Sequence, residues 1–355
     1  MKARVTVSTA AALAAGLLAA GTAPASAEPL VYVPTGDQSE VQVIDAAEDR
    51  VIGTVAGLPA AHGLAITPDG SRLVVGSFAE REAGEAMPPK PEGVSAEDHA
   101  AHHAAAKPGT KTGVSTLSVV EVKSGKVVRR IDVPGAVHHV SVSPDGRLAA
   151  VTQPRAGTVS IVDLEAGKVT ATVETGAQPN YTAFSPDGKK LYVSNGGDGA
   201  ITVLDGPHWK PAGTIASGEG AGHIVLSPDG ARLYVANAGA GTVTAIDLAA
   251  GKVVKTVKAG EFLHALDLSE DGSTIYTADN SGDRLVAIDT SSWETRSATL
   301  APGPYHLMVV RGTGKIYVSS NERDRLWVVD AKTLEATGEI PIGGIGHQSA
   351  QSPSS

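Results

Sequence analysis

Histidines with a common spacing are the residues of this chain that most clearly suggest chemistry. The chain contains eleven histidines, whereas random placement among 355 residues would put fewer than one of them at seven chosen positions. Asn180 and Gly222 occupy the position of interest in two of seven sequence copies. Counting six residues back from the proline of each Ser/Thr-Pro-Asp-Gly sequence, or from its aligned equivalent, gives His62, His138, His264, His306 and His347 in the other five. We therefore predict that these side chains share one structural role.

Two more histidines, His139 and His223, lie one residue later in the same register. Neutral imidazole is a frequent ligand of zinc and copper, and metal–nitrogen bonds of about 2.0–2.1 Å require a scaffold that directs several rings at one point. The spacing therefore predicts a histidine site that holds zinc or copper. A single histidine at the start of a strand more often bonds a loop carbonyl, so a structural role is the alternative for each residue alone.

A third group of histidines lies in an insertion at about residues 79–113. His99, His102 and His103 are spaced so that one helical turn would carry them on one side. Exposed segments rich in histidine commonly capture metal ions, and the proline-rich first half of the insertion indicates a loop. We expect this loop to assist metal capture or transfer. The alternative is a solvated loop that binds nothing.

The elements that position these side chains are tandem repeats of about 42 residues. The sequence Leu-Tyr-Val-Ser-Asn at residues 191–195 recurs in related form at 233–237, 275–279 and 316–320, with weaker copies near 30, 73 and 148. Repeats therefore begin near residues 30, 73, 148, 191, 233, 275 and 316, and the second is longer by the insertion. Each contains four short runs, and five of the seven carry an Asp-Gly turn, as propeller blades do. The predicted fold is all-β: a seven-bladed β-propeller with four-stranded antiparallel blades.

The repeated Leu-Tyr-Val-x-Asn segments resemble the YVTN family of β-propellers, which is specific in fold and diverse in function. The resemblance implies that the run before Ser-Pro-Asp-Gly is the innermost strand of a blade and that the Leu-Tyr-Val run is the second. The chain then begins in a second strand at residues 30–33, and residues 347–352 supply the missing innermost strand. Pairing of the two chain ends would close the ring and remove an open sheet edge.

This strand order places the histidines where the chain enters each innermost strand, at one face of the central funnel. The connection after a second strand emerges on the same face, so the insertion at residues 79–113 would reach over the funnel mouth.

The N-terminal residues predict export. A basic start with Lys2 and Arg4, an Ala/Leu-rich stretch and the small residues 25–27 indicate a signal peptide cut after Ala27. Residues 28–355 would then form the propeller in a secreted or periplasmic protein, with no membrane insertion. Removal of the leader leaves 27 basic and 38 acidic residues, a net charge of −11, which argues against nucleic acid as a partner. The absence of cysteine excludes disulfides and thiolate ligands.

The first functional interpretation is an exported metal carrier or metallochaperone, whose partners are a metal ion and a protein that receives it. Nitrous oxide reductase, cytochrome cd1 nitrite reductase and periplasmic zinc metallochaperones offer analogies at the level of the fold. A metal-dependent enzyme such as a lyase, lactonase or oxidase, acting on a small molecule in the same funnel, is the second interpretation. A non-catalytic partner-binding propeller is the third. No catalytic residue and no organic cofactor site is assigned, and we expect a monomer.

Overall fold

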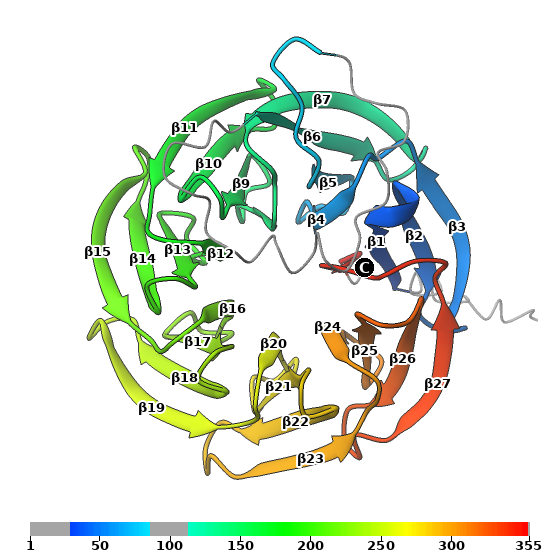
Figure 1. The fold of residues 1–355 in the computed structure, drawn as a ribbon, viewed down its shortest axis with the longest axis vertical. Helices are drawn as coiled ribbons and strands as arrows, with labels where there is room; N and C mark the ends of the chain where they lie inside the picture. The colour runs from blue at the N-terminus through cyan, green and yellow to red at the C-terminus, as the bar shows by residue number, and fades with distance from the viewer. Residues whose placement is uncertain (1–28, 86–112, 354–355) are drawn as a thin grey trace, which may run out of the picture.

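Seven four-stranded antiparallel sheets stand side by side around a common axis in the computed structural model (Figure 1). The structure describes residues 29–85 and 113–353. The predicted leader and the three histidines of the insertion (His99, His102 and His103) lie outside these described residues. Within the described ranges, no helix is long and apolar enough to cross a membrane. The predicted seven-bladed β-propeller is confirmed.

The first four blades each contain four strands, which follow one another from the axis to the rim. Blade 1 consists of β28 (Ala350–Gln351), β1 (Leu30–Thr35), β2 (Glu40–Asp45) and β3 (Arg50–Ala56), with a short 3-10 helix, η1 (Gly36–Gln38), after β1. Blade 2 consists of β4 (Ala61–Ile66), β5 (Arg72–Ser77), β6 (Val114–Glu121) and β7 (Lys126–Pro134). Blade 3 consists of β8 (Val140–Val142), β9 (Leu148–Gln153), β10 (Thr158–Asp163) and β11 (Lys168–Glu174). Blade 4 consists of β12 (Pro179–Phe184), β13 (Lys190–Asn195), β14 (Ala200–Asp205) and β15 (Lys210–Ala216).

The remaining three blades repeat this arrangement. Blade 5 consists of β16 (Ala221–Leu226), β17 (Arg232–Asn237), β18 (Thr242–Asp247) and β19 (Lys252–Lys258). Blade 6 consists of β20 (Leu263–Leu268), β21 (Thr274–Asp279), β22 (Arg284–Asp289) and β23 (Thr295–Thr299). Blade 7 consists of β24 (Pro304–Val310), β25 (Lys315–Ser320), β26 (Arg325–Asp330) and β27 (Ala336–Pro341).

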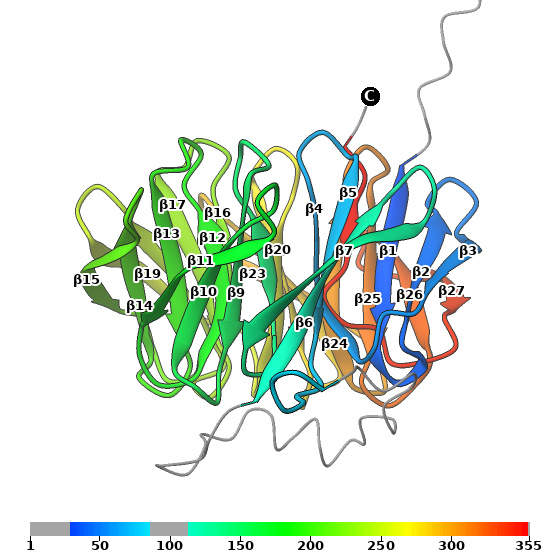
Figure 2. The same cartoon turned by 90° about the horizontal axis from the view of Figure 1, so that it is seen from above.

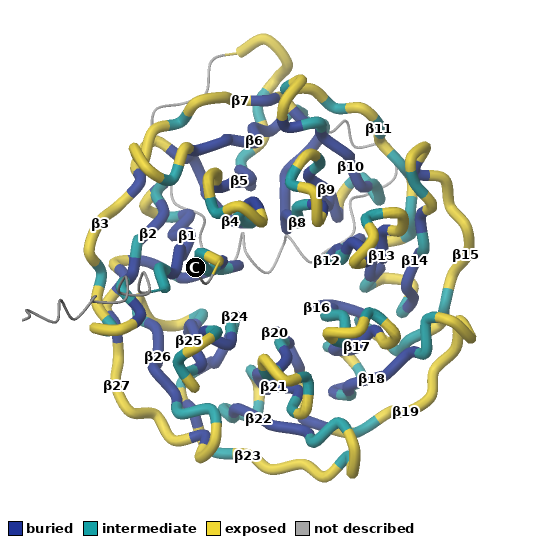
Figure 3. Tube along the Cα trace, turned by 180° about the vertical axis from the view of Figure 1, so that it is seen from behind, coloured by how far each residue is buried: buried dark blue, intermediate teal, exposed yellow. Residues whose placement is uncertain are grey.

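The core lies between the faces of neighbouring blades. Between blades 3 and 4, for example, Val159 and Ile161 pack in one buried cluster with Leu191 and Val193. Branched apolar side chains suit this position because they fill the pleated surface of a sheet that is covered on both faces. The outermost strands turn one face to solvent, and Figure 3 shows them as an exposed rim around buried inner strands.

The ring closes through the two ends of the chain. In blade 1, β28 pairs with β1, so that Gln351 lies opposite Val31 and Ala350 opposite Tyr32. The backbone N–H of Ser352 donates to the carbonyl oxygen of Leu30 at 2.8 Å. This pairing confirms the predicted closure and leaves β1 without an open edge.

The disk has two loop faces, seen edge-on in Figure 2. The innermost strands start at one face, which we call the histidine face, and end at the other, which we call the turn face. At the turn face, the Asp69 carboxylate accepts hydrogen bonds from the Thr67 hydroxyl at 2.5 Å and from the Ser71 N–H at 3.0 Å. The Asp271 carboxylate accepts hydrogen bonds from the Ser269 hydroxyl at 2.6 Å and from the Ser273 N–H at 3.0 Å. These bonds fix the turn that leads into the second strand.

Candidate metal centre

Five of the innermost strands contain one extra residue near the histidine face. In blade 2, Ala61 lies opposite Ser77 and Leu64 opposite Val75, so His62 and Gly63 share one partner on β5. The same irregularity occurs in β12, β16, β20 and β24. A β-bulge of this kind bends the strand and re-aims its side chains. Two successive residues of a blade thereby become available to line the channel.

The pairing shows that the register of His306 differs by one residue from the sequence prediction. Val309 lies opposite Ile316 in blade 7, as Ile66 lies opposite Leu73 in blade 2. Counting back from these pairs aligns Tyr305, not His306, with His62. The reason is that blade 7 lacks the Pro-Asp-Gly turn, and the alignment through Gly312 was one residue too late.

Two rings of side chains follow from this corrected register. The first ring takes the earlier bulge position of each blade and consists of His347, His62, His138, Asn180, Gly222, His264 and Tyr305. The second ring takes the next position and consists of Gln348, Gly63, His139, Tyr181, His223, Ala265 and His306. A side chain is excluded at Gly63, where a Cβ would lie 2.7 Å from the carbonyl oxygen of His138.

Hydrogen bonds to the second ring support the same register. The backbone N–H groups of His139 and Tyr181 donate to the hydroxyls of Thr152 and Ser194, each at 3.0 Å. The N–H of His306 donates to the Ser319 hydroxyl at 3.1 Å. A bulge leaves a backbone donor without its ladder partner, and a buried donor must be satisfied. The opposing hydroxyl therefore stabilises the bulge in three blades.

Three histidines of the second ring come together at the axis. Ligand nitrogens of His139, His223 and His306 all lie within 4.8 Å of one another. Their side chains belong to alternate blades (3, 5 and 7) and are buried, with at most 5% exposure. Each imidazole ring centroid lies 5.0–5.6 Å from the other two. Small ring rotations would bring the three nitrogens to the separation of about 3.3–3.4 Å that ligands of a tetrahedral ion adopt.

The orientation of His139 is fixed by a backbone carbonyl. Its Nδ1 lies 2.8 Å from the carbonyl oxygen of Asn180. Because a carbonyl can only accept, Nδ1 carries the proton, and Nε2 of the neutral ring holds the lone pair. Histidines that bind metals in proteins usually donate their second ring nitrogen in this way. His62 is held likewise by the carbonyl oxygen of His138 at 2.8 Å.

A fourth imidazole stands beside this group. Nε2 of His264 lies 3.4 Å from Nε2 of His306, which is the edge of a tetrahedron with bonds of about 2.0–2.1 Å. The ring of His264 is stacked on Tyr305 with centroids 3.8 Å apart. Burial lowers the pKa of His306 well below its ordinary value, and the surrounding histidines lower it further, His264 first among them. His306 is therefore neutral at pH 7 and keeps a lone pair for a metal ion.

The remaining histidines of the channel adjoin this centre. His62 and His347 are stacked with centroids 4.2 Å apart, and His138 lies 4.9 Å from His62. All seven histidines that the sequence placed in the funnel are buried and in one continuous cluster. Tyr181, Tyr305 and Gln348 belong to the same rings and were not singled out by the sequence. A count of both successive positions in every repeat, rather than of histidines alone, would have found Tyr181 and Gln348.

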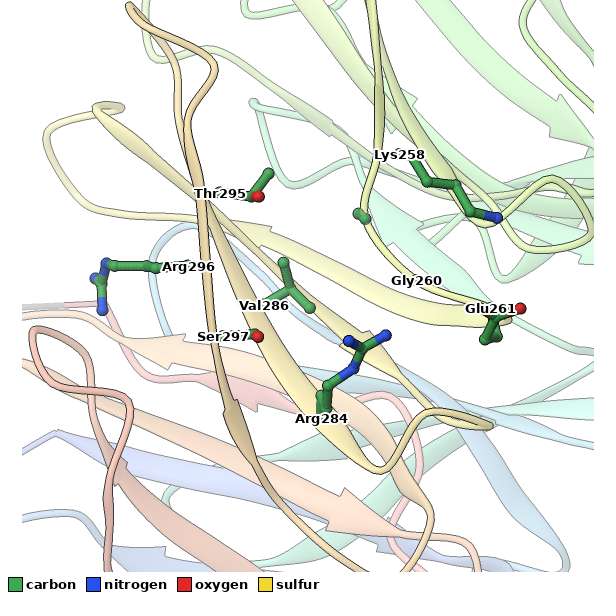
Figure 4. A pocket seen from close by; sticks show the side chains of 9 residues that line it. Lys258, Gly260, Glu261, Arg284, Val286, Thr295, Arg296 and Ser297 are labelled. Atoms are coloured by element: carbon green, nitrogen blue, oxygen red, sulfur yellow. The ribbon is translucent and has the colours of Figure 1, made fainter.

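A separate pocket lies near the rim, between β19 and the strands β22 and β23 (Figure 4). Its volume is about 280 Å³. Lys258 donates to the carbonyl oxygen of Ala240 at 3.0 Å, and Arg284 forms an ion pair with Asp279 at 2.6 Å. Because these charges already have partners, the pocket offers no convergent set of ligands comparable with the channel.

The fold and the channel define a seven-bladed propeller with a histidine-rich centre, and comparisons with known proteins agree on the fold. The profile of the YNCE-like β-propeller family matches residues 183–347. The profile of the cytochrome D1 heme domain matches residues 110–223. Each match covers less than half of the chain, so together they support a β-propeller and no narrower family. No curated protein matches the chain in sequence.

Several solved structures share the architecture at low identity. The periplasmic gluconolactonase of Pseudomonas aeruginosa superposes with a TM-score of 0.71 at 17% identity, covering 92% of this chain and 99% of that one. Hydrazine synthase of Kuenenia stuttgartiensis gives 0.62 at 21% identity, covering 77% of each chain. A dihydro-heme d1 dehydrogenase gives 0.59 at 18% identity, covering 90% of this chain and 74% of that one. At these identities the likeness shows the fold alone.

The haem suggested by two of these relatives does not fit the channel of this chain. Ring centroids from different blades approach closely across the axis: His223 and His306 lie 5.0 Å apart, and His62 and His306 lie 6.5 Å apart. Imidazole side chains therefore fill this level of the channel, and a macrocycle has no room between them. The donor set suits a single metal ion bound directly by the protein.

Proposed function

We propose that this chain binds a zinc or copper ion through His139, His223 and His306, with His264 as the fourth ligand. The observation that carries the proposal is the convergence of the three second-ring nitrogens within 4.8 Å, together with the 3.4 Å separation of His264 and His306. Imidazole is a ligand that both ions accept. Burial of the cluster keeps water and competing protons away from the lone pairs.

A carrier role, as in a metallochaperone, suits this ligand set better than a permanent structural site. The four proposed ligands are all imidazoles, so no carboxylate or thiolate offsets the charge of the ion. The first-ring residues His62, His138 and His347 adjoin the centre and offer alternative ligands. An ion can then move by exchanging one imidazole at a time, which favours release to a partner protein. The expected export of the chain and the predicted capture role of His99, His102 and His103 remain part of this proposal.

Isothermal titration of the purified chain with zinc and with copper tests the proposed four-histidine site. The change is His139→Ala/His306→Ala, which removes two of four ligands. We expect a loss of affinity greater than about 100-fold, because changes beyond the ligands themselves already cost about 10- to 100-fold. The control is His208→Ala, since His208 is exposed and lies outside both rings. Binding by the double variant as tight as that of the parent would contradict the site.

A metal-dependent hydrolase of lactones is the second candidate function. It is supported by the shared architecture with the gluconolactonase, which extends over 92% of this chain. A catalytic site must keep one coordination position for water or substrate, so this candidate requires that His264 stay unbound. Turnover of small lactones by the metal-loaded chain, lost after chelation and lost in the His139→Ala/His306→Ala variant, would establish it. Absence of turnover with metal bound would leave the carrier role.

A further inference from the structure

The side-chain amide of Gln348 has only one orientation that satisfies its neighbours. Its Oε1 accepts from the backbone N–H groups of Leu64 and Val140 at 3.2 and 3.1 Å. Its Nε2 donates to the carbonyl oxygen of Val140 at 2.9 Å. A flipped amide would set donors against donors, so the assignment follows from the backbone. Nε2 then donates its second hydrogen to the hydroxyl oxygen of Tyr181 at 3.0 Å.

This bond determines what the Tyr181 hydroxyl can offer. Because its oxygen accepts from Gln348, its own hydrogen must point to another acceptor. Among residues 29–85 and 113–353, the only hydrogen bond found at this hydroxyl is the one from Gln348. A phenol ordinarily keeps its proton at neutral pH, so the Tyr181 hydroxyl remains a donor.

Tyr181 also lies between two of the proposed metal ligands. Its ring centroid is 4.5 Å from that of His139 and 4.6 Å from that of His223. It belongs to blade 4, whereas those histidines belong to the flanking blades 3 and 5. His264, the proposed fourth ligand, comes from blade 6. A ligand approaching the ion past Tyr181 therefore arrives from a different side than His264 does.

The first ring carries no aromatic side chain on this side. Five blades place a histidine or tyrosine ring there, but blades 4 and 5 place Asn180 and Gly222. A Cβ at Gly222 would meet nothing closer than the carbonyl oxygens of Ala236 and Gly220, at 3.4 and 3.6 Å. These are ordinary contacts, so the packing of the backbone does not itself require a glycine at position 222.

We propose that this side of the channel is a subsite for a small anion that binds the metal ion in place of His264 and accepts a hydrogen bond from the Tyr181 hydroxyl. This inference rests on the proposed metal site. A phenol donor favours an anionic oxygen or nitrogen ligand over a neutral one, since hydrogen bonds to charged groups are the stronger ones. Because imidazole rings from different blades lie only 5.0–6.5 Å apart at this level, the ligand is limited to a few atoms. Tyr181 acts as a positioning residue, because it holds the incoming ligand while the histidines hold the ion.

The test uses the full chain loaded with copper(II) and titrated with azide, followed by the azide-to-copper absorption band. Tyr181→Phe removes the donor, and we expect azide to bind about 10- to 100-fold more weakly. Gly222→Val adds a side chain on this side of the channel and should weaken azide by a comparable factor. Tyr234→Phe, the same change at a tyrosine that is 2% exposed in the core of blade 5, is the matched control and should leave azide binding unchanged.

Copper content measured before each titration separates the two claims. A parent that takes up no copper overturns the proposed function and this inference with it. Variants that hold copper as the parent does, but bind azide with the parent's affinity, overturn the inference alone. Loss of azide affinity in Tyr181→Phe at full copper content, with the Tyr234→Phe control unchanged, supports it.

Discussion

The two ends of the innermost strands differ in how far their side-chain interactions are repeated from blade to blade. At the turn face, blades 2 and 6 repeat the same chemistry: an aspartate accepts from a hydroxyl two residues before it and from an N–H two residues after it. At the histidine face, the same strands carry a bulge whose two side chains change from blade to blade. The repeated bonds at one end stabilise these blades alike, whereas variation at the other end builds one asymmetric centre. Stability and metal binding should therefore respond to different substitutions.

Removal of the C-terminal strand should have the largest effect, because it disturbs both the closure of the ring and the side chains of the channel. Deletion of residues 345–355 removes β28, its pairs with β1, and Gln348, whose amide bonds Leu64 and Val140. The open edge of β1 and the buried N–H groups left without partners should lower the melting temperature and promote aggregation. Thermal unfolding and light scattering would show this. An unchanged melting temperature would contradict the role assigned to the closure.

Substitutions of first-ring histidines other than His264 test whether the four proposed ligands alone hold the ion. His62→Ala/His138→Ala removes two imidazoles, as the second-ring double variant does, but leaves all four proposed ligands in place. We expect the zinc affinity to fall by about 10-fold or less, since only neighbours of the ligands change. Titration calorimetry on both double variants would check it. An equal loss in both would mean that the rings act as one site.

A substitution at the turn face should lower the stability of the protein and leave its metal affinity unchanged. Asp271→Ala removes an acceptor of bonds from Ser269 and Ser273. We expect the free energy of unfolding to fall by about 1–2 kcal/mol, because the exposed hydrogen bonds from Ser269 and Ser273 are lost, with no change in metal affinity. Urea unfolding and calorimetry on the same sample would separate the two effects. A weaker metal site in this variant would show that the two ends are coupled.

Acid should destabilise the turns at the turn face in a narrow range of pH, where their aspartates become protonated. Hydrogen bonds from Thr67 and Ser71 lower the pKa of Asp69 to about 2, and bonds from Ser269 and Ser273 lower that of Asp271 to about 2. A carboxylate whose pKa is lower in the folded state adds stability above its ordinary pKa and loses it as the pH falls. We therefore expect a small loss of stability between about pH 4 and pH 2. Asp69→Asn/Asp271→Asn should flatten this part of the profile measured by urea unfolding, and an unchanged slope would contradict it.

The sequence predicted the fold and most of the centre because repeats copy local patterns. The alternation of strands and Asp-Gly turns was enough for seven blades, and the incomplete first repeat was enough for closure by the C-terminus. The register of His306 was missed because blade 7 has Arg311 and Gly312 where other blades carry the Pro-Asp turn. The grouping of His139 with His223 across blade 4 depends on how blades pack around the axis, and no spacing within the chain encodes that distance.

The most direct test of the metal centre is anomalous diffraction from crystals of the zinc- or copper-loaded chain, with data collected on both sides of the metal absorption edge. We expect one strong anomalous peak at the axis, about 2.0–2.1 Å from nitrogens of His139, His223 and His306. A strong peak elsewhere, with none between these three rings at full metal content, would contradict the proposed centre.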